Sequence, residues 1–154
     1  MSDTIEKRLS DLGVTLPAAA APAGSYVPFV QSGKLLFTAG QLPLKDGKLQ
    51  ATGLLGRDLD TAAGKEAAKL CAINILAQVK AAVGDLSKIR RLVKISVFVA
   101  STPDFTEQHV VANGASDFLF AVLGDVGKHA RAAVGMAALP LNAAVEIEAI
   151  IEVE

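Results

Sequence analysis

The chain has 154 residues, of which 51% are hydrophobic and 20% charged, and its 15 basic and 16 acidic side chains give a net charge of -1. This composition excludes a disordered chain and gives no electrostatic basis for binding nucleic acid or a membrane surface. The single cysteine, Cys71, excludes an internal disulfide. A charged N-terminus, with no run of about 18 uncharged apolar residues, predicts a cytoplasmic protein without a membrane span.

Residues 1–154 fit one domain, which begins with a short amphipathic helix and a connector over residues 1–21. The helix is predicted over Asp3–Leu12, where Asp3 and Glu6 can form a capping pair. Residues 15–25 are rich in alanine and proline, which is typical of a connecting segment.

Strands and two long helices are predicted in the rest of the chain. The strands are expected at Tyr26–Val30, Leu35–Leu42, Leu92–Ala100, Arg131–Leu139 and Ala144–Val153. Helical periodicity spans Leu59–Val83, and a second helix is predicted from Pro103 to about Leu123. This order predicts an α+β sandwich, in which one mixed sheet carries both long helices on one face.

The second face of that sheet has no helix to cover it. In the last strand, Val145 and Ile147 point to one face, while Glu146 and Glu148 point to the other. The predicted strands carry more apolar surface than two helices can cover, and the residues that show this are Val134, Met136 and Leu36. We therefore expect the chain to form an oligomer through the uncovered face.

Motifs that would hold a metal or a cofactor are absent from the sequence. The two histidines, His109 and His129, lie in no metal-ligand spacing, and the glycines form no phosphate-binding loop. No nucleophilic-serine motif is present either. If the protein is an enzyme, we expect it to work without metal or cofactor.

Arg131 is the residue that most needs an explanation, because it lies in an apolar strand. A buried guanidinium must be paired or must face a polar cavity, and its fork suits a carboxylate held by two hydrogen bonds. The carboxylate could belong to a ligand. Equally, it could be Glu146 or Glu148 of the neighbouring predicted strand, so both explanations stay open at this point.

Four stretches of the sequence resemble one known family. They are Gly24-Ser25-Tyr26-Val27, LLFTAGQLPL, VKISVFVASTPDF and ARAAVGMAALPLNAAVEIEAIIEV. Together they are similar to the YjgF/RidA (Rid) family, also labelled L-PSP endoribonucleases, over roughly residues 22–153. The resemblance implies a chorismate-mutase-like fold and a homotrimer with sites in clefts between subunits. It also implies cofactor-free hydrolysis of 2-imino or 2-enamino acids to 2-oxo acids and ammonia.

The resemblance also assigns roles to particular residues. Arg131 matches the arginine that binds the substrate carboxylate, and Glu146 matches the glutamate that positions the attacking water. The further substrate-binding positions are Tyr26, Gly40, Asn113 and Ala133. Ala133 departs from the family, since many deaminases have Arg-Ser-Cys where this chain has Arg-Ala-Ala.

Two other functions remain as alternatives. A protein that senses small carboxylic acids would also use Arg131, but it would gain nothing from a second carboxylate such as Glu146. A ribonuclease is the weakest alternative, because the chain has no histidine pair, no strongly basic surface and no tryptophan for stacking on bases.

Overall fold

The computed structural model of the chain describes residues 2–22 and 24–154. Its main sheet has five strands in the order β1-β2-β7-β5-β6. They are β1 (Phe29–Ser32), β2 (Leu35–Thr38), β7 (Val145–Val153), β5 (Ile89–Ala100) and β6 (Ala130–Met136). Only β5 and β6 pair in parallel, so the sheet is mixed, as predicted. Two short strands, β3 (Leu44–Lys45) and β4 (Lys48–Leu49), form a hairpin whose turn is the predicted Asp46-Gly47.

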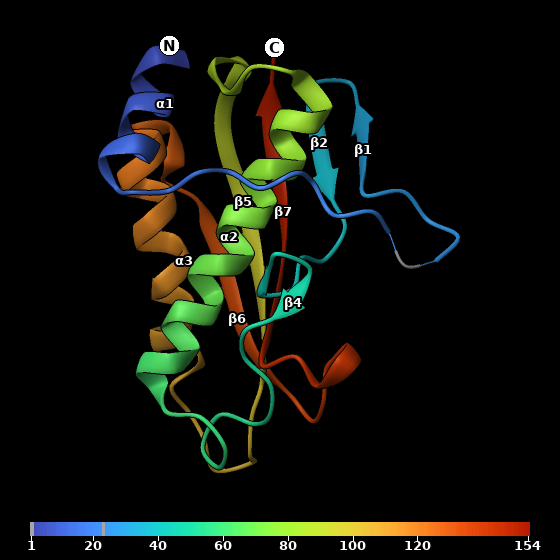
Figure 1. The fold of residues 1–154 in the computed structure, drawn as a ribbon, viewed down its shortest axis with the longest axis vertical. Coiled ribbons are helices and arrows are strands. Elements are labelled where there is room, and N and C mark those ends of the chain that lie inside the picture. Colours follow the sequence, from blue (N-terminus) through green and yellow to red (C-terminus); the bar gives the residue numbers. More distant parts are fainter. Residues whose placement is uncertain (1, 23) are drawn as a thin grey trace.

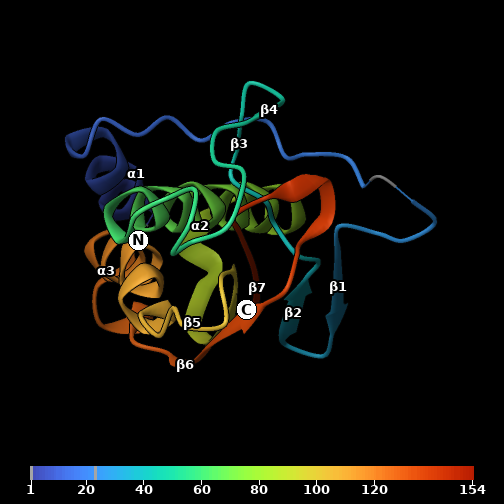
Figure 2. The ribbon, with the colours of Figure 1, turned by 90° about the horizontal axis from the view of Figure 1, so that it is seen from below.

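Both long helices, α2 (Thr61–Val83) and α3 (Gln108–Leu123), lie side by side on one face of the sheet (Figures 1 and 2). Gly114 allows this close approach, because a Cβ there would overlap the main chain at Lys65. Alternate residues of β7 are buried beneath the helices, whereas Glu146 and Glu148 point to the other face. Leu36 is fully buried on the covered face, so counting it toward the open face was wrong.

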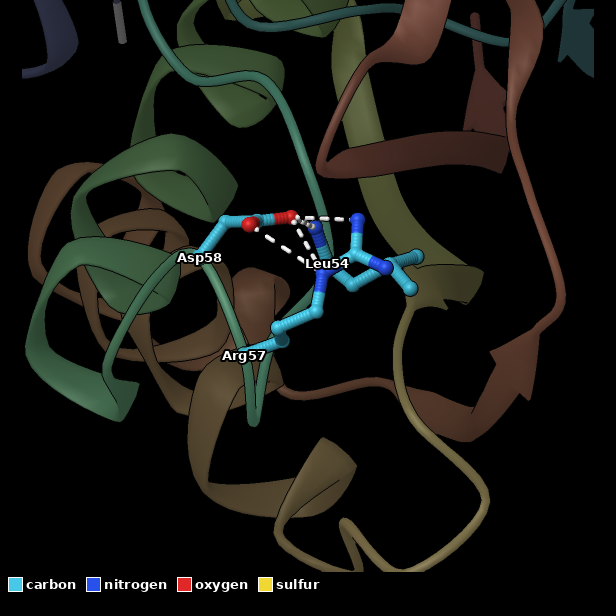
Figure 3. Close-up of polar contacts among 3 residues, drawn as sticks. All are labelled: Leu54, Arg57 and Asp58. Carbon is cyan, nitrogen blue, oxygen red and sulfur yellow. Dashed lines mark hydrogen bonds and ion pairs between the residues drawn. The ribbon is translucent and has the colours of Figure 1, made fainter.

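The start of α2 is fixed by the loop before it. Arg57 contacts the Asp58 carboxylate through Nε and Nη2, and Asp58 Oδ2 accepts a hydrogen bond from Leu54 N at 2.8 Å (Figure 3). Asp60 then caps the helix by accepting from Ala63 N at 2.8 Å. Gly84 ends the helix, as predicted.

The N-terminal helix α1 (Ser2–Asp11) packs against α3. Its buried residues are Ile5 and Leu9, while the predicted capping side chain of Asp3 lies outside the described residues. The connector then runs across the outer side of α2 toward β1 (Figure 1), where Gln78 Nε2 donates to Ala20 O at 2.9 Å.

Several predicted boundaries were wrong. The strand predicted over Leu35–Leu42 ends at Thr38, and the strand predicted from Leu92 begins at Ile89. The segment from Pro103 to Glu107 precedes α3, because Phe105 N bonds to Thr102 O and closes a turn there. The first strand begins at Phe29 rather than Tyr26. The strand containing Arg131 ends at Met136, where its partner β5 also ends, so no ladder is left to extend it toward Leu139.

By length and composition alone, one described helical segment, Gln108–Gly127, could cross a membrane. It contains Asp117 and Asp125, and core helices of globular proteins pass the same test. Several of its apolar side chains belong to the hydrophobic core, among them Val111, Ala115, Leu119 and Val122. Packing within the chain therefore accounts for part of its apolar composition.

Candidate functional site

Arg131 lies on the edge strand β6, and its side chain reaches the neighbouring helix α3. Nη1 donates to Asn113 Oδ1 at 2.9 Å and to Ser116 Oγ at 3.1 Å, while Nη2 donates to the main-chain oxygen of His109 at 3.2 Å. These three acceptors come from successive turns of α3, so one face of the helix fixes the guanidinium.

All three acceptors are electrically neutral. No carboxylate of residues 2–22 or 24–154 forms an ion pair with Arg131. The alternative of an internal pair with Glu146 or Glu148 is therefore wrong, because β5 separates β6 from β7. A guanidinium has five N–H donors. Nε–H and one N–H of Nη2 have no partner in the described chain, which leaves them available to an anion.

The hydrogen-bond chain continues beyond Arg131. Ser116 Oγ lies 2.9 Å from His129 Nε2, and His129 Nδ1 lies 2.6 Å from the main-chain oxygen of Gly127. Arg131, Ser116 and His129 also line an open pocket of about 350 Å³, whose remaining lining residues are Asp117, Phe120, Gly127 and Lys128. A small anion of amino-acid size fits this volume.

Glu146 lies on the open face of the sheet, next to Gly40. A Cβ at position 40 would overlap the Glu146 carboxylate, so a larger residue there would displace that side chain. Partial burial raises the pKa of Glu146, and the nearby Glu148 carboxylate adds to that rise. Gly40 and Tyr26 line a pocket of about 130 Å³ that Leu141 also borders.

The site residues expected from the sequence therefore fall into two groups. Arg131 and Asn113 form one group on the helix-covered side, and Ala133 lies two residues along β6, partly buried against the core. Glu146, Gly40 and Tyr26 form the other group. We call these the arginine half-site and the glutamate half-site.

The sheet register shows how far apart the half-sites are. Arg131 is level with Ile95 and Ala149, whereas Glu146 is level with Phe98 and Val134. The two residues are therefore two strands apart, about 10 Å, and three residues apart along the strands, again about 10 Å. They also point to opposite faces, so within one chain they cannot contact the same small substrate.

Sequence reasoning missed the contact of Ser116 with Arg131 and the hydrogen bond between Ser116 and His129. The only signal was the position of His129, two residues before Arg131. Ser116 carried no signal, because its role depends on how α3 packs against β6.

Comparison with known proteins identifies the family. Residues 6–153 match the family model described as "YjgF/chorismate mutase-like, putative endoribonuclease". The chain belongs to this YjgF/RidA family. Its resemblance to the family is thus confirmed, together with the expected fold.

Similar proteins carry different names. The chain is 51% identical to protein TCP17 of Trypanosoma cruzi, over 98% of this chain and 95% of that protein. It is 62% identical to a protein of unknown function from Agrobacterium tumefaciens, whose crystal structure superposes with a TM-score of 0.94 over 99% of this chain and 94% of that chain. A 2-iminobutanoate/2-iminopropanoate deaminase of Dermatophagoides farinae is 28% identical, over 92% of this chain and 95% of that protein.

Proposed function

We propose that the protein hydrolyses reactive 2-imino and 2-enamino acids to 2-oxo acids and ammonia. The observation that carries the proposal is that every described hydrogen-bond partner of Arg131 is neutral, which leaves its charge and two N–H donors available to a substrate carboxylate. The deaminase of D. farinae supplies the reaction class.

The chemistry needs few groups because an imine carbon is already electrophilic. Arg131 holds the carboxylate, and Glu146 orients a water molecule against the imine carbon. As the water oxygen bonds to that carbon, one water proton passes to Glu146, and Glu146 returns a proton to the imine nitrogen. The resulting carbinolamine releases ammonia when its hydroxyl proton passes to the amino nitrogen and the C–N bond breaks, which leaves the C=O group of the 2-oxo acid. A raised pKa makes Glu146 a better proton acceptor than an ordinary carboxylate.

The proposed enzyme is a homotrimer, in which Arg131 of one subunit meets Glu146 of the partner subunit. The separation of the half-sites within one chain supports this arrangement. So do the exposed apolar residues of the open face, which include Val30, Phe37 and Val134. Light scattering should give three times the 15.9 kDa of one chain. A cytoplasmic location stays a prediction.

A second candidate is a protein that binds small carboxylic acids without transforming them. The pocket beside Arg131 favours it, because that pocket lies entirely in the arginine half-site and needs no glutamate. An endoribonuclease is a weaker candidate, because the described residues show no pair of histidine side chains that act together. The His109 side chain is exposed, and in the described chain this residue contacts Arg131 only through its main-chain oxygen.

The test is to generate 2-aminoacrylate or 2-iminobutyrate in situ and to follow release of the 2-oxo acid. The wild-type protein should accelerate release, and Arg131→Ala should not. If neither protein accelerates release while the wild type binds pyruvate, the binding function replaces the enzymatic one.

A further inference from the structure

We infer that Ser116 and His129 are positioning residues, which hold the Arg131 guanidinium in the orientation that receives a carboxylate. The inference rests on the proposed function for its effect on ligands. Its structural part concerns Arg131 alone and can be tested without any ligand.

The direction of each hydrogen bond in this chain follows from its last member. The main-chain oxygen of Gly127 can only accept, so His129 Nδ1 carries the hydrogen and donates it over 2.6 Å. In the neutral ring Nε2 is then an acceptor, and the Ser116 hydroxyl donates to it. A lone pair of Ser116 Oγ accepts from Arg131 Nη1.

These hydrogen-bond directions leave Ser116 Oγ only the role of acceptor toward Arg131. A hydroxyl free to rotate would present its hydrogen to Arg131 part of the time and would repel the Nη1 donor. Because His129 holds that hydrogen, Ser116 Oγ stays an acceptor toward Arg131. With Asn113 it occupies both N–H groups of Nη1, so the available donors are Nε–H and one N–H of Nη2.

The two histidines of the chain provide a matched control. His129 acts through both ring nitrogens, whereas His109 accepts from Arg131 through its main-chain oxygen, which any residue at that position would supply. His109→Ala should therefore leave Arg131 unchanged, and His129→Ala should release it. Ser116→Ala should act like His129→Ala. Ser116→Thr should keep the order of hydrogen bonds because threonine has a hydroxyl, and His129→Gln should keep it because glutamine has an acceptor.

The first measurement is nitrogen-15 relaxation of the Arg131 Nε–H signal, assigned by its loss in Arg131→Lys. We expect a rigid signal in the wild type, His109→Ala and the two conservative variants, and a mobile signal in Ser116→Ala and His129→Ala. The second measurement is binding of pyruvate by calorimetry, which should weaken by roughly three- to tenfold in the two disrupting variants. The double variant Ser116→Ala/His129→Ala should be no weaker than either single one, because both break the same chain.

The outcomes separate the two proposals. A rigid Arg131 signal in both Ser116→Ala and His129→Ala would overturn the positioning role, even if Arg131→Lys loses pyruvate binding. A mobile signal in those variants, with pyruvate binding unaffected even in Arg131→Lys, would support the positioning role and contradict the proposed function.

Discussion

Two arginines of this chain have opposite surroundings. Arg57 contacts the Asp58 carboxylate through Nε and Nη2 at the surface, and that pairing raises the pKa of Arg57. Arg131 is partly buried and is held by two side-chain oxygens and one main-chain oxygen, none of them charged. The charge of Arg57 is therefore already neutralised within the fold, whereas the charge of Arg131 remains available to a ligand.

Two carboxylates show the same contrast. The hydrogen bond from Arg57, followed by that from Leu54 N, lowers the pKa of Asp58. Burial, followed by the charge of Glu148, raises the pKa of Glu146. The first carboxylate is more stable ionised in the fold than in water, and the second is less stable. A charge that destabilises the folded chain is expected at a functional site rather than at a structural one.

The largest effect is expected for Glu146→Gln. Glutamine keeps the shape of the side chain but cannot accept a proton, so turnover should fall by roughly 10²–10⁴ if Glu146 acts on water. Binding of pyruvate should persist, because Arg131 is intact. Turnover at the wild-type level would contradict the role of Glu146 and favour main-chain groups as the anchor of the water.

Arg131→Lys should have the next largest effect. Lysine keeps the charge but loses the fork and the contacts to α3, so affinity for 2-oxo acids should fall by about 1–3 kcal/mol. Calorimetry measures this change, and Arg57→Lys is the matched control that should leave affinity unaltered. Equal losses in the two variants would remove the distinction between the two arginines.

Glu146→Gln should also make the folded chain more stable at pH 7, although most substitutions that remove a charge from a fold make it less stable. A carboxyl whose pKa is raised by folding binds its proton more tightly in the folded chain, so the folded state loses stability as pH rises above the ordinary glutamate value, about 4.3. The variant should therefore melt at a higher temperature than wild type at pH 7, and the gain should vanish toward pH 4. A lower Tm at pH 7 would mean that Arg131 of the neighbouring subunit in the proposed trimer offsets the effect of burial on Glu146.

The smallest effect is expected for Asp58→Asn. The lowered pKa of Asp58 contributes stability above the ordinary aspartate value, which is lost as pH falls through the lowered one. Because the pair is solvent-exposed, the Tm should fall slightly at pH 7, by less than the change at Glu146, and turnover should stay at the wild-type level. A loss of turnover would connect this loop to the site.

The sequence predicted the elements whose signals are local. Asp46-Gly47 gave the hairpin turn and Gly84 the end of α2, because each depends on the residues beside it. The surroundings of Arg131 depend instead on the order of the strands. Its strand and β7 are neighbours in the sequence, which suggested that they pair directly, but β5 lies between them. Because β5 lies between the two strands, Arg131 contacts α3 instead, and no periodicity in the sequence indicates this contact.

The position of Arg131 and Glu146 on opposite faces of the sheet has a genetic consequence for the proposed trimer. A subunit carrying Arg131→Lys still offers an intact glutamate half-site, and one carrying Glu146→Gln still offers an intact arginine half-site. When the two inactive chains are expressed together in equal amounts, random mixing should make about a quarter of the clefts fully wild type. Two defective alleles would then complement each other, although neither encodes a working protein alone.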